Sequence, residues 1–340
     1  MYYQESFKPE GHELSDEIRY LQAKKTLNMM INFLKAKNLK PYKQMGKSSY
    51  SRRKTPEDSE VNINDTIKNQ NKILITGASG NLGQEIFKNL SKHYNVTGTY
   101  YKNKLPGLKK LNLVNFIETK KFVEKINPNI VIHLSAFTNP SLNEKFKKLS
   151  KVINLISTRN LTKSLKKKTK FIFFSTDKVY RYQKHKKSYK ENSICKSNFV
   201  YGVNKYLCEK IIKKKFKNYI ILRIPIVHSN SVKKKFSFLN NCIHKLKQKR
   251  RVKVYSNIFR SFVSLDQLIT LVKILIKSRN YGIYNIGTRS YSYSERLKYI
   301  CKKMKIIFKG AIDNVSSDLN DKRIILNTEK LKRKFKFKFN

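Results

Sequence analysis

The chain has 340 residues, of which 39% are apolar, which is enough for one large or two modest domains with a substantial core. Its net charge is +53, yet the basic residues are mostly lysine and occur in every segment. A nucleic-acid binder would concentrate arginine and stacking aromatics on one face. We therefore favour a compositional origin, typical of AT-rich coding sequence, over specific nucleic-acid binding. The charge would still attract an anionic substrate.

The composition also argues against membrane, disulfide and zinc proteins. No apolar run approaches the roughly 20 residues of a membrane span, and residues 1–10 are polar and carry acids rather than resembling a signal peptide. The four cysteines have no C-x-x-C spacing and no histidine at ligand spacing, which favours free thiols in a reducing compartment. We expect a cytoplasmic protein with no membrane contact and no metal.

Residues 1–70 carry no recognisable motif. Leu14–Lys37 has a rough apolar stripe at helical spacing, and Asn38–Asn71 is polar and contains several turn-forming residues, as in a linker. We expect a partly ordered extension without chemistry of its own. A docking arm or the remnant of another domain is the alternative.

The first clear strand–turn–helix follows this region. A short apolar strand, Lys72–Thr76, ends at Gly77, and a helix is expected over Leu82–His93. Gly77 allows a sharp turn, Gly80 allows backbone to approach a pyrophosphate, and Gly83 allows the helix to pack tightly on the sheet. The helix N-terminus offers free N–H groups to an anion. This context favours dinucleotide binding over a plain turn before a helix.

Strand and helix signals alternate along the rest of the chain. This pattern predicts an α/β fold, namely a Rossmann-type doubly wound parallel sheet with a small C-terminal substrate domain. We assign residues 71–225 to the NAD(P)-binding Rossmann domain, with 263–287 returning to it, and 226–340 mainly to substrate binding. The further expected elements are strands Asn95–Tyr101, Lys109–Leu113, Asn129–Leu134, Lys170–Ser175, Tyr219–Arg223 and Val252–Tyr255, and helices Asn115–Lys125, Leu142–Lys166, Val200–Phe216, Val232–Lys249 and Leu265–Ser278.

Ligands of such a sheet bind at the carboxyl ends of the strands, so the residues after each strand are the candidate site residues. NAD-preferring folds place an acid after the second strand, but no Asp or Glu occurs between Tyr94 and Val114. Lys102 and Lys104 lie in that window, and either ammonium could pair with a 2′-phosphate. This favours NADP(H), with Lys102 as the main contact, and leaves NAD(H) open.

The fourth strand ends in small residues. Ser135, Ala136 and Thr138 follow it and would let backbone approach the cofactor. His133 lies inside the apolar strand itself, and we interpret it as a packed core histidine rather than a catalyst.

Tyr201 and Lys205 are the main catalytic candidates. Residues i and i+4 of a helix share a face, so both side chains point the same way. A phenol with a pKa near ~10 is a poor acid–base catalyst at neutral pH, and an adjacent ammonium favours the phenolate and lowers that pKa. Thr176, in a Ser-Thr-Asp stretch after the fifth strand, would hydrogen-bond the substrate oxygen. Lysine four residues after tyrosine also occurs elsewhere in this chain. The assignment of Tyr201 and Lys205 as catalytic candidates therefore depends on their position after the fifth strand and the Ser-Thr-Asp stretch.

Ordered motifs occur along about residues 72–335. The most specific are Phe173–Tyr180 (FFSTDKVY), Ser188–Glu191 (SYKE) and Val200–Lys205 (VYGVNK) with Glu209. Further matches are Val131–Thr138, Asn154, Ile221–Pro225, Ser261–Asp266 and Gly282–Gly287. Together with the G-x-x-G-x-x-G spacing, they resemble the dTDP-4-dehydrorhamnose reductase family of extended short-chain dehydrogenases/reductases.

The resemblance implies an NADPH-dependent reductase of a 4-keto sugar nucleotide in cell-surface polysaccharide biosynthesis, with Thr176, Tyr201 and Lys205 as catalytic residues. Two alternatives stay open: an NAD-dependent sugar-nucleotide epimerase or dehydratase, and a non-catalytic NADP-binding subunit like the regulatory subunit of methionine adenosyltransferase. The implied partner is a sugar-nucleotide substrate, and a homodimer is left open. The expected cofactor-binding residues are Gly77, Gly80, Asn81, Leu82, Gly83, Lys102, Asn112, Leu113, Ser135, Ala136, Thr138, Tyr201 and Lys205.

The chain departs from the family pattern at a few positions. Asn112 stands where the family usually has Asp, Arg181–Gln183 replaces an Asp-Gly, and Ile224–Pro225 replaces a Thr-Ser pair. These departures bear on the identity of the sugar more than on the reductase chemistry. Arg260 and Arg289 are candidates for diphosphate contacts, with solvated surface arginines as the equal alternative.

Overall fold

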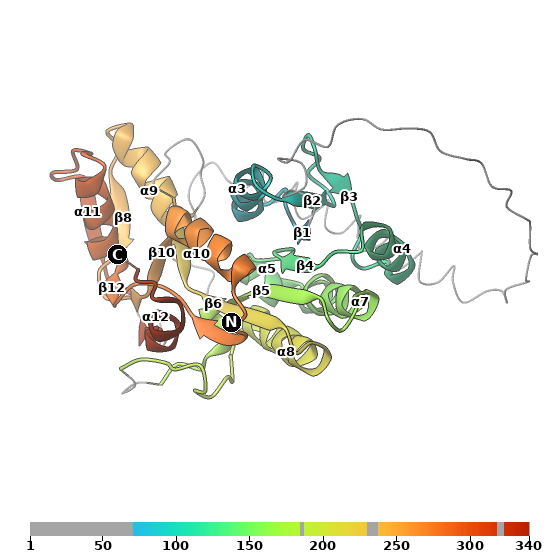
Figure 1. Cartoon of the computed structure of the whole chain (residues 1–340). Helices are drawn as coiled ribbons and strands as arrows, with labels where there is room; N and C mark the ends of the chain where they lie inside the picture. Colours follow the sequence, from blue (N-terminus) through green and yellow to red (C-terminus); the bar gives the residue numbers. More distant parts are fainter. Residues whose placement is uncertain (1–70, 184–186, 230–236, 318–322, 340) are drawn as a thin grey trace, which may run out of the picture. The chain divides into compact units, whose positions relative to one another are not determined.

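A seven-stranded, entirely parallel sheet forms the centre of the structure (Figure 1). The computed structural model describes residues 71–183, 187–229, 237–317 and 323–339, which lie within one compact unit, Ile63–Asn340. The expected extension, residues 1–70, lies outside the described residues. In spatial order the strands are β11 (Gly282–Asn285), β6 (Tyr219–Ile224), β5 (Lys170–Thr176), β4 (Ile130–His133), β1 (Lys72–Thr76), β2 (Asn95–Tyr100) and β3 (Lys109–Lys110).

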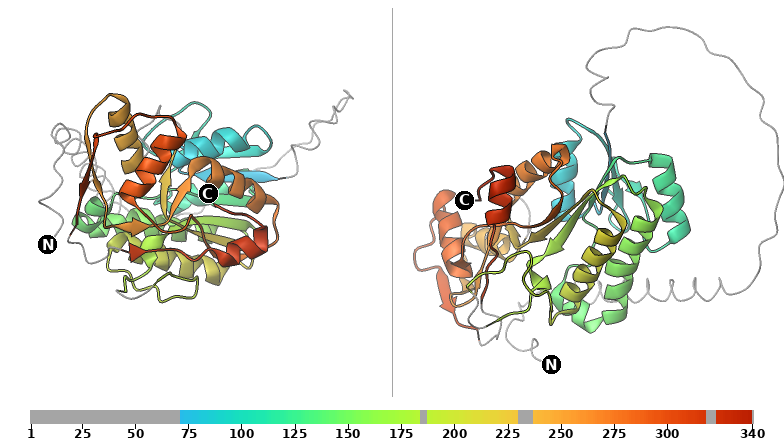
Figure 2. Two further views of the ribbon diagram at one scale, coloured as in Figure 1. Left: turned by 90° about the vertical axis from the view of Figure 1, so that its left-hand side faces the viewer. Right: turned by 60° about the horizontal axis from the view of Figure 1, so that its bottom comes forward.

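Helices cover both faces of this sheet, as Figure 2 shows. Apolar side chains point to both faces because a buried parallel strand has no solvent side. Ile73 and Ile75 of β1 pack into the core beneath α3 and α10, whereas Leu74 packs into the core beneath α4, α7 and α8. The helix bounds are α3 Asn81–Leu90, α10 Leu265–Lys277, α4 Phe116–Ile126, α7 Ser157–Ser164 and α8 Val200–Lys215. The doubly wound Rossmann-type fold class predicted from the sequence is confirmed.

The direction of strand addition reverses between β1 and β4. From β1 the chain adds β2 and β3 on one side, and then β4, β5 and β6 on the other. A crevice forms at such a switch point, outside the carboxyl ends of the strands. The glycine-rich turn after β1 and the loop after β4 meet there.

The long helical stretch expected over Leu142–Lys166 is present, but it is interrupted. The chain forms α5 (Pro140–Lys145), α6 (Lys147–Ser150), a π-helical segment η1 (Lys151–Ile156) and then α7. Helical geometry breaks at Phe146, whose dihedral angles are φ −118° and ψ 57°.

Side-chain amides near this break hold the loop after β4. Asn154 Oδ1 accepts from Phe137 N at 2.7 Å, and Asn143 Nδ2 donates to Phe137 O at 2.9 Å. Ser150 Oγ donates to Asn143 Oδ1. The interrupted helix therefore anchors the loop that carries Ala136 and Thr138.

A second, smaller layer is built from two excursions of the chain. The first leaves the sheet after β6 and returns at α10, and the second lies between β11 and α12. The excursions pair with each other through β8 and β13 and through β9, β12 and β14. The bounds are β7 Ile226–His228, α9 Phe238–Lys247, β8 Val252–Tyr255, β9 Phe259–Arg260, β10 Phe262–Ser264, β12 Tyr291–Ser292, α11 Tyr293–Lys303, β13 Ile312–Val315, β14 Arg323–Ile324 and α12 Glu329–Phe335. Of the helix expected over Val232–Lys249, residues 232–236 lie outside the described residues, and the rest contains α9.

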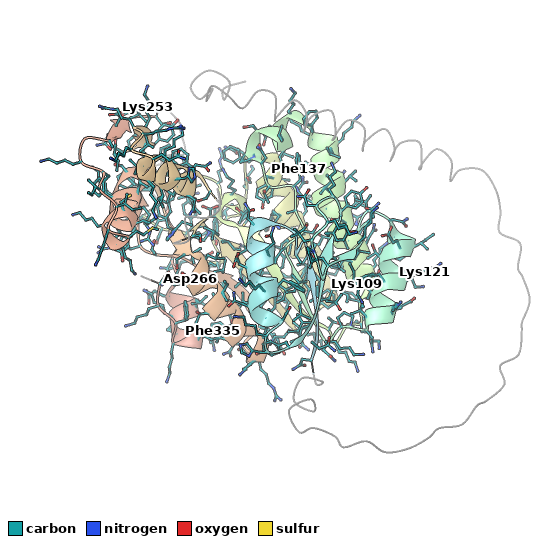
Figure 3. The ribbon with its side chains drawn as sticks, turned by 90° about the horizontal axis from the view of Figure 1, so that it is seen from above. Lys109, Lys121, Phe137, Lys253, Asp266 and Phe335 are labelled. Carbon is teal, nitrogen blue, oxygen red and sulfur yellow. The ribbon has the colours of Figure 1, made fainter. Side chains whose placement is uncertain are left out.

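Lysines project from elements in all parts of the described structure. Figure 3 labels Lys109 on β3, Lys121 on α4 and Lys253 on β8, and all three are exposed. The positive charge is thus spread over the described surface, as the sequence suggested. No helix in the described part of the chain is long and apolar enough to cross a bilayer.

Candidate active site

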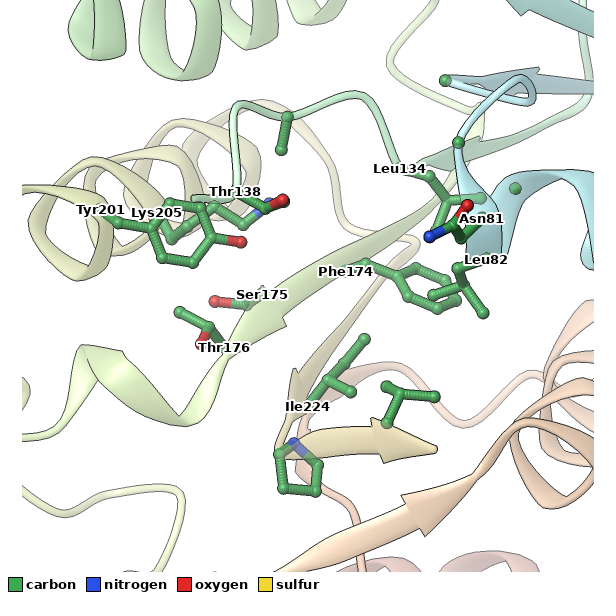
Figure 4. A pocket seen from close by; sticks show the side chains of 16 residues that line it. Asn81, Leu82, Leu134, Thr138, Phe174, Ser175, Thr176, Tyr201, Lys205 and Ile224 are labelled. Atoms are coloured by element: carbon green, nitrogen blue, oxygen red, sulfur yellow. The ribbon is translucent and has the colours of Figure 1, made fainter. Parts of the chain in front are cut away.

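One cavity of about 410 Å³ lies at the carboxyl ends of the central strands (Figure 4). It extends from the glycine-rich turn, beside Asn81 and Leu82, to Tyr201 and Lys205 on α8. Its lining residues are Gly77, Gly80, Asn81, Leu82, Gly83, Leu134, Ala136, Thr138, Phe174, Ser175, Thr176, Tyr201, Lys205, Ile224, Pro225 and Val227.

Two glycines at the turn after β1, Gly77 and Gly83, have no room for a side chain. Gly77 has φ +73°, and a Cβ there would lie 2.7 Å from the Cα and N of Ser135. A Cβ on Gly83 would overlap the carbonyl oxygen of Gly77. Gly80 is the N-cap of α3, and no side chain caps this helix. The N-terminus of α3 is therefore open to an anionic group lying in the cavity.

Lys205 is a buried ammonium beside an aromatic ring. Only 3% of the residue is exposed, and Nζ lies 4.1 Å from the centre of the Phe173 ring. Burial lowers the pKa of Lys205 to about 8, although the nearby Cys208 and Glu209 oppose the shift. This lysine can therefore change its protonation state near neutral pH.

The expected lowering of the Tyr201 pKa is wrong. Burial raises the pKa of the Tyr201 phenol, and the neighbouring Asp177 and Cys208 raise it further. These effects of burial and negative charge, rather than the Lys205 ammonium, set the direction of the shift. Tyr201 is accordingly held as a neutral phenol, which is a proton donor.

Thr176 ends β5 and faces the same cavity. Its Oγ1 accepts from the backbone N–H of Lys178 at 3.2 Å and donates to Asp177 Oδ1 at 3.1 Å. Asp177 begins the short 3-10 turn η2 (Asp177–Val179) and is 7% exposed. Burial raises the pKa of Asp177, and the charges of Lys178 and Arg260 oppose that shift.

Most of the residues predicted for the site line this one cavity. Lys102, Asn112, Leu113 and Ser135 do not. Lys102 is exposed beyond the end of β2, and Leu113 is buried in the core beneath α4. Asn112 holds a local turn, since its N–H donates to Glu118 Oε1 at 2.8 Å and its Oδ1 accepts from Val114 N at 3.1 Å. Ser135 packs its backbone against Gly77.

Several lining residues were not predicted as site residues. Leu134, Phe174 and Ser175 lie at the ends of β4 and β5, where the rule of strand ends could have indicated them. The remaining ones are Ile224, Pro225 and Val227. Ile224 ends β6, so the same rule could have indicated it, whereas Pro225 and Val227 reach the cavity in the crossing into the second layer.

The two arginines proposed for diphosphate contacts do not line the cavity. Arg260 is 9% exposed and donates from Nη1 to Phe259 O at 2.8 Å. Arg289 stacks on Tyr291, with the guanidinium carbon 5.4 Å from the ring centre.

The fold and this site define a member of the extended short-chain dehydrogenase/reductase superfamily: a parallel sheet with a glycine-rich turn at the switch point and a Tyr-x-x-x-Lys pair on the facing helix. The RmlD substrate binding domain family matches residues 71–303. Because this match covers more than half of the chain, the protein belongs to that family.

Solved structures and curated relatives agree with this placement. A dTDP-4-dehydrorhamnose reductase from Bacillus anthracis, solved in complex with NADP, is 25% identical, has a TM-score of 0.68 and covers 78% of this chain and 92% of its own. The WbmG enzyme of Bordetella bronchiseptica, solved with NAD and UDP, shares the fold at 17% identity and a TM-score of 0.67, covering 79% of this chain and 89% of its own.

The curated relatives include the methionine adenosyltransferase 2 subunit beta of Xenopus laevis. It is 27% identical over 183 residues, which are 53% of this chain and 54% of that protein. The chain thus spans about half the length of the curated relatives of this kind that it matches. Its similarity covers both enzymes and a protein named as a subunit.

Proposed function

We propose that the protein is an NADPH-dependent reductase of a 4-keto sugar nucleotide, resembling dTDP-4-dehydrorhamnose reductase. One observation carries the proposal: a single cavity brings together the open N-terminus of α3 and the side chains of Thr176, Tyr201 and Lys205. The helix N-terminus suits a pyrophosphate, and the three side chains suit proton transfer to a carbonyl oxygen.

The residues of the cavity fit a dinucleotide. Added Cβ atoms on Gly77 or Gly83 would meet backbone atoms, so these two positions require glycine, which leaves the backbone there open to a ligand. Gly77, Gly80 and Gly83 would hold the pyrophosphate, and Lys205 would hold the nicotinamide ribose. The nicotinamide supplies the hydride when it is bound.

The chain's own side chains supply the proton. A keto group that receives a hydride needs a proton on its oxygen, and a neutral Tyr201 phenol can donate it. The raised pKa of Tyr201 keeps the phenol protonated before the reaction, so its proton is available to the carbonyl oxygen. Oxidation of a hydroxyl, with which an epimerase or dehydratase would begin, needs the phenolate instead. Thr176 would orient the substrate oxygen.

A second candidate is a non-catalytic, NADP-binding subunit. The relatives named as beta subunits of methionine adenosyltransferase favour it. The cavity would then hold the cofactor without turning it over. The presence of Thr176, Tyr201 and Lys205 in one cavity supports the reductase instead.

The deciding experiment is NADPH oxidation, followed at 340 nm, with a dTDP-4-keto-6-deoxy sugar as the substrate. Steady oxidation that needs the sugar nucleotide and is lost in Tyr201→Phe would support the reductase. Tight NADPH binding without turnover, in a chain that co-purifies with a methionine adenosyltransferase catalytic subunit, would overturn it in favour of the second candidate. Such a reductase would work in the cytoplasm, in the synthesis of cell-surface polysaccharide. A homodimer remains compatible with this role.

A further inference from the structure

The hydroxyl of Thr176 has a limited capacity for hydrogen bonds. A threonine hydroxyl carries one proton and two lone pairs. In the structure its proton points to Asp177 Oδ1 at 3.1 Å, and one lone pair accepts from Lys178 N at 3.2 Å. While Asp177 is ionised, Thr176 has no proton to offer to a second acceptor.

A substrate carbonyl oxygen can only accept a hydrogen bond. The role proposed for Thr176 therefore needs its proton to be released from Asp177. Protonation of Asp177 achieves this, because a carboxylic acid can donate to the second lone pair of Thr176 Oγ1. The hydroxyl proton is then free for the substrate oxygen.

Asp177 lies where such a protonated carboxyl is plausible. It is 7% exposed, between β5 and η2, and burial raises its pKa. The charged and titratable groups that face it are Lys178 on its own turn, Arg260 of β9 and Tyr201 of α8. Lys178 and Arg260 favour the carboxylate, and the phenol of Tyr201 is itself made harder to ionise by a charge on Asp177.

Resting on the proposed reductase function, we infer that Asp177 is a positioning residue that acts in its protonated form: it turns the Thr176 hydroxyl toward the substrate oxygen and removes a negative charge from beside Tyr201. Both effects help the same step. Tyr201 gives its proton to the carbonyl oxygen and becomes a phenolate, which a neutral Asp177 tolerates better than an ionised one.

The first test is the pH dependence of turnover in Asp177→Asn, which keeps the shape of the side chain and is neutral at every pH. Wild-type turnover should fall as the pH rises through the pKa of Asp177, by about tenfold per pH unit for the loss of one essential proton. Asp177→Asn should keep turnover within about tenfold of the wild-type maximum. Its pH profile should lack this fall in turnover, which we call the alkaline limb. Asp313→Asn, on β13, is the matched control and should keep the limb.

A limb that persists unchanged in Asp177→Asn would overturn the inference, since Lys205 would then be its source. If Asp177→Asn does not fold, Asp177→Ser provides the same neutral test. In a Thr176→Val background, Asp177→Asn should change turnover less than it does in wild type, because residues that act through one another are not additive. Equal effects in both backgrounds would contradict a role through Thr176.

The second test does not need turnover, and so separates this inference from the proposed function. Fluorotyrosine-labelled protein is titrated by ¹⁹F NMR, with the Tyr201 signal assigned from Tyr201→Phe. Asp177→Asn should shift the Tyr201 titration to lower pH, because Asp177 is a carboxylate at the high pH where Tyr201 ionises and asparagine carries no charge. An unmoved titration would overturn the inference even if the enzyme reduces a keto sugar. A shifted titration in a protein without turnover would leave the electrostatic coupling standing and overturn the reductase alone.

Discussion

Glu209 and Arg223 form a buried ion pair: Arg223 Nη2 lies 2.7 Å from Glu209 Oε2, and Arg223 Nε lies 3.1 Å from Oε1. The two side chains are 1% and 2% exposed. Glu209 also accepts from Ser175 Oγ at 2.5 Å, and Arg223 Nη1 donates to Tyr180 Oη at 2.7 Å. The pair therefore ties α8, which carries Tyr201, to the ends of β5 and β6.

Arg223→Met should destabilise the protein strongly. It leaves the carboxylate of Glu209 buried without its partner, which typically costs about 3–5 kcal/mol. The free energy of unfolding in urea is the measurement. Arg251→Met is the matched control, because the Arg251–Asp313 pair is largely exposed, with side chains 71% and 33% exposed. Its substitution should change stability little. Equal losses in the free energy of unfolding for the two variants would show that burial of the Glu209–Arg223 pair does not increase the cost of breaking it.

Gly202→Ala should separate α8 from η2. A Cβ at Gly202 would overlap the carbonyl oxygen of Lys178 and the hydroxyl of Ser197, so the helix must shift by a small distance. Tyr201 precedes this glycine, and Thr176 precedes η2, so their separation should change and turnover should fall. Turnover and thermal stability are measured together, with overpacking expected to cost about 1–3 kcal/mol. Val203→Ala, at a residue 41% exposed on the same helix, is the control. Full activity in Gly202→Ala would show that this close contact does not set the position of Tyr201.

Tyr201→Phe should abolish proton donation without disturbing the cavity. The substitution removes only the hydroxyl, so NADPH affinity should persist while turnover falls by roughly 10²–10⁴-fold. Turnover and NADPH affinity are measured on the same preparation. Tyr206→Phe, at a partly exposed position of α8, is the control and should behave as wild type. Near wild-type turnover in Tyr201→Phe would mean that another group is the general acid.

His133 should make the fold sensitive to acid. It is fully buried, with Nδ1 2.6 Å from Thr76 Oγ1 and Nε2 2.9 Å from Thr158 Oγ1. Burial, and then the charge of Lys205, lower its pKa from 6.5 to about 3. Between pH 6.5 and about 3, His133 is therefore protonated in the unfolded chain and neutral in the folded one. Neutral His133 makes its full contribution to the free energy of unfolding above pH 6.5. That contribution is lost as the pH falls toward 3, by at most about 1.4 kcal/mol per pH unit.

The measurement is the free energy of unfolding as a function of pH. His133→Gln, which can still donate and accept, should flatten the slope below pH 6.5, and the same substitution at the exposed His93 should not. An unchanged slope in His133→Gln would assign the acid sensitivity elsewhere. The buried His228, whose pKa is also lowered to about 3, would be the next residue to test.

NADPH should bind more tightly than NADH. No acid lies between Tyr94 and Val114 to accept the ribose hydroxyls, and Lys102 follows the end of β2 at an exposed position. One charge-assisted contact to a 2′-phosphate is worth about 1.5–3 kcal/mol, or roughly ten- to a hundredfold in affinity. Titration of both cofactors into wild type and Lys102→Ala measures it. Equal wild-type affinities would contradict the prediction, and a preference that survives Lys102→Ala would assign it to Lys104.

The parts that were predicted from the sequence depend on local patterns. The turn at Gly77, the strand before it and the helix after it follow from a short apolar run and from glycine spacing, which are patterns of a few neighbouring residues. Tyr201 and Lys205 were found because helical periodicity and the position after β5 fix their face. The structure places them together as expected, although their catalytic roles stay predictions.

The parts that were missed depend on contacts between distant segments. The amides of Asn143 and Asn154, on either side of the break at Phe146, bond a loop outside the helix, and helical periodicity cannot reveal such partners. Pro225 and Val227 reach the cavity through the crossing into the second layer. The pKa of Tyr201 depends on burial and on Asp177, which lies on another element, so the spacing of Tyr201 and Lys205 gave its direction wrongly.

The two excursions from the sheet also bear on how the sequence of this protein can change in evolution. Within the first excursion β7 pairs with β10, but its other two strands need the second excursion, since β8 pairs with β13 and β9 pairs with β12. Both begin at strand ends on the cavity edge of the sheet and leave the strand order around β1 and β4 untouched. If the protein is the reductase proposed above, insertions or exchanges in these segments can therefore alter its choice of substrate while the glycine turn is inherited unchanged, provided that the two excursions vary together.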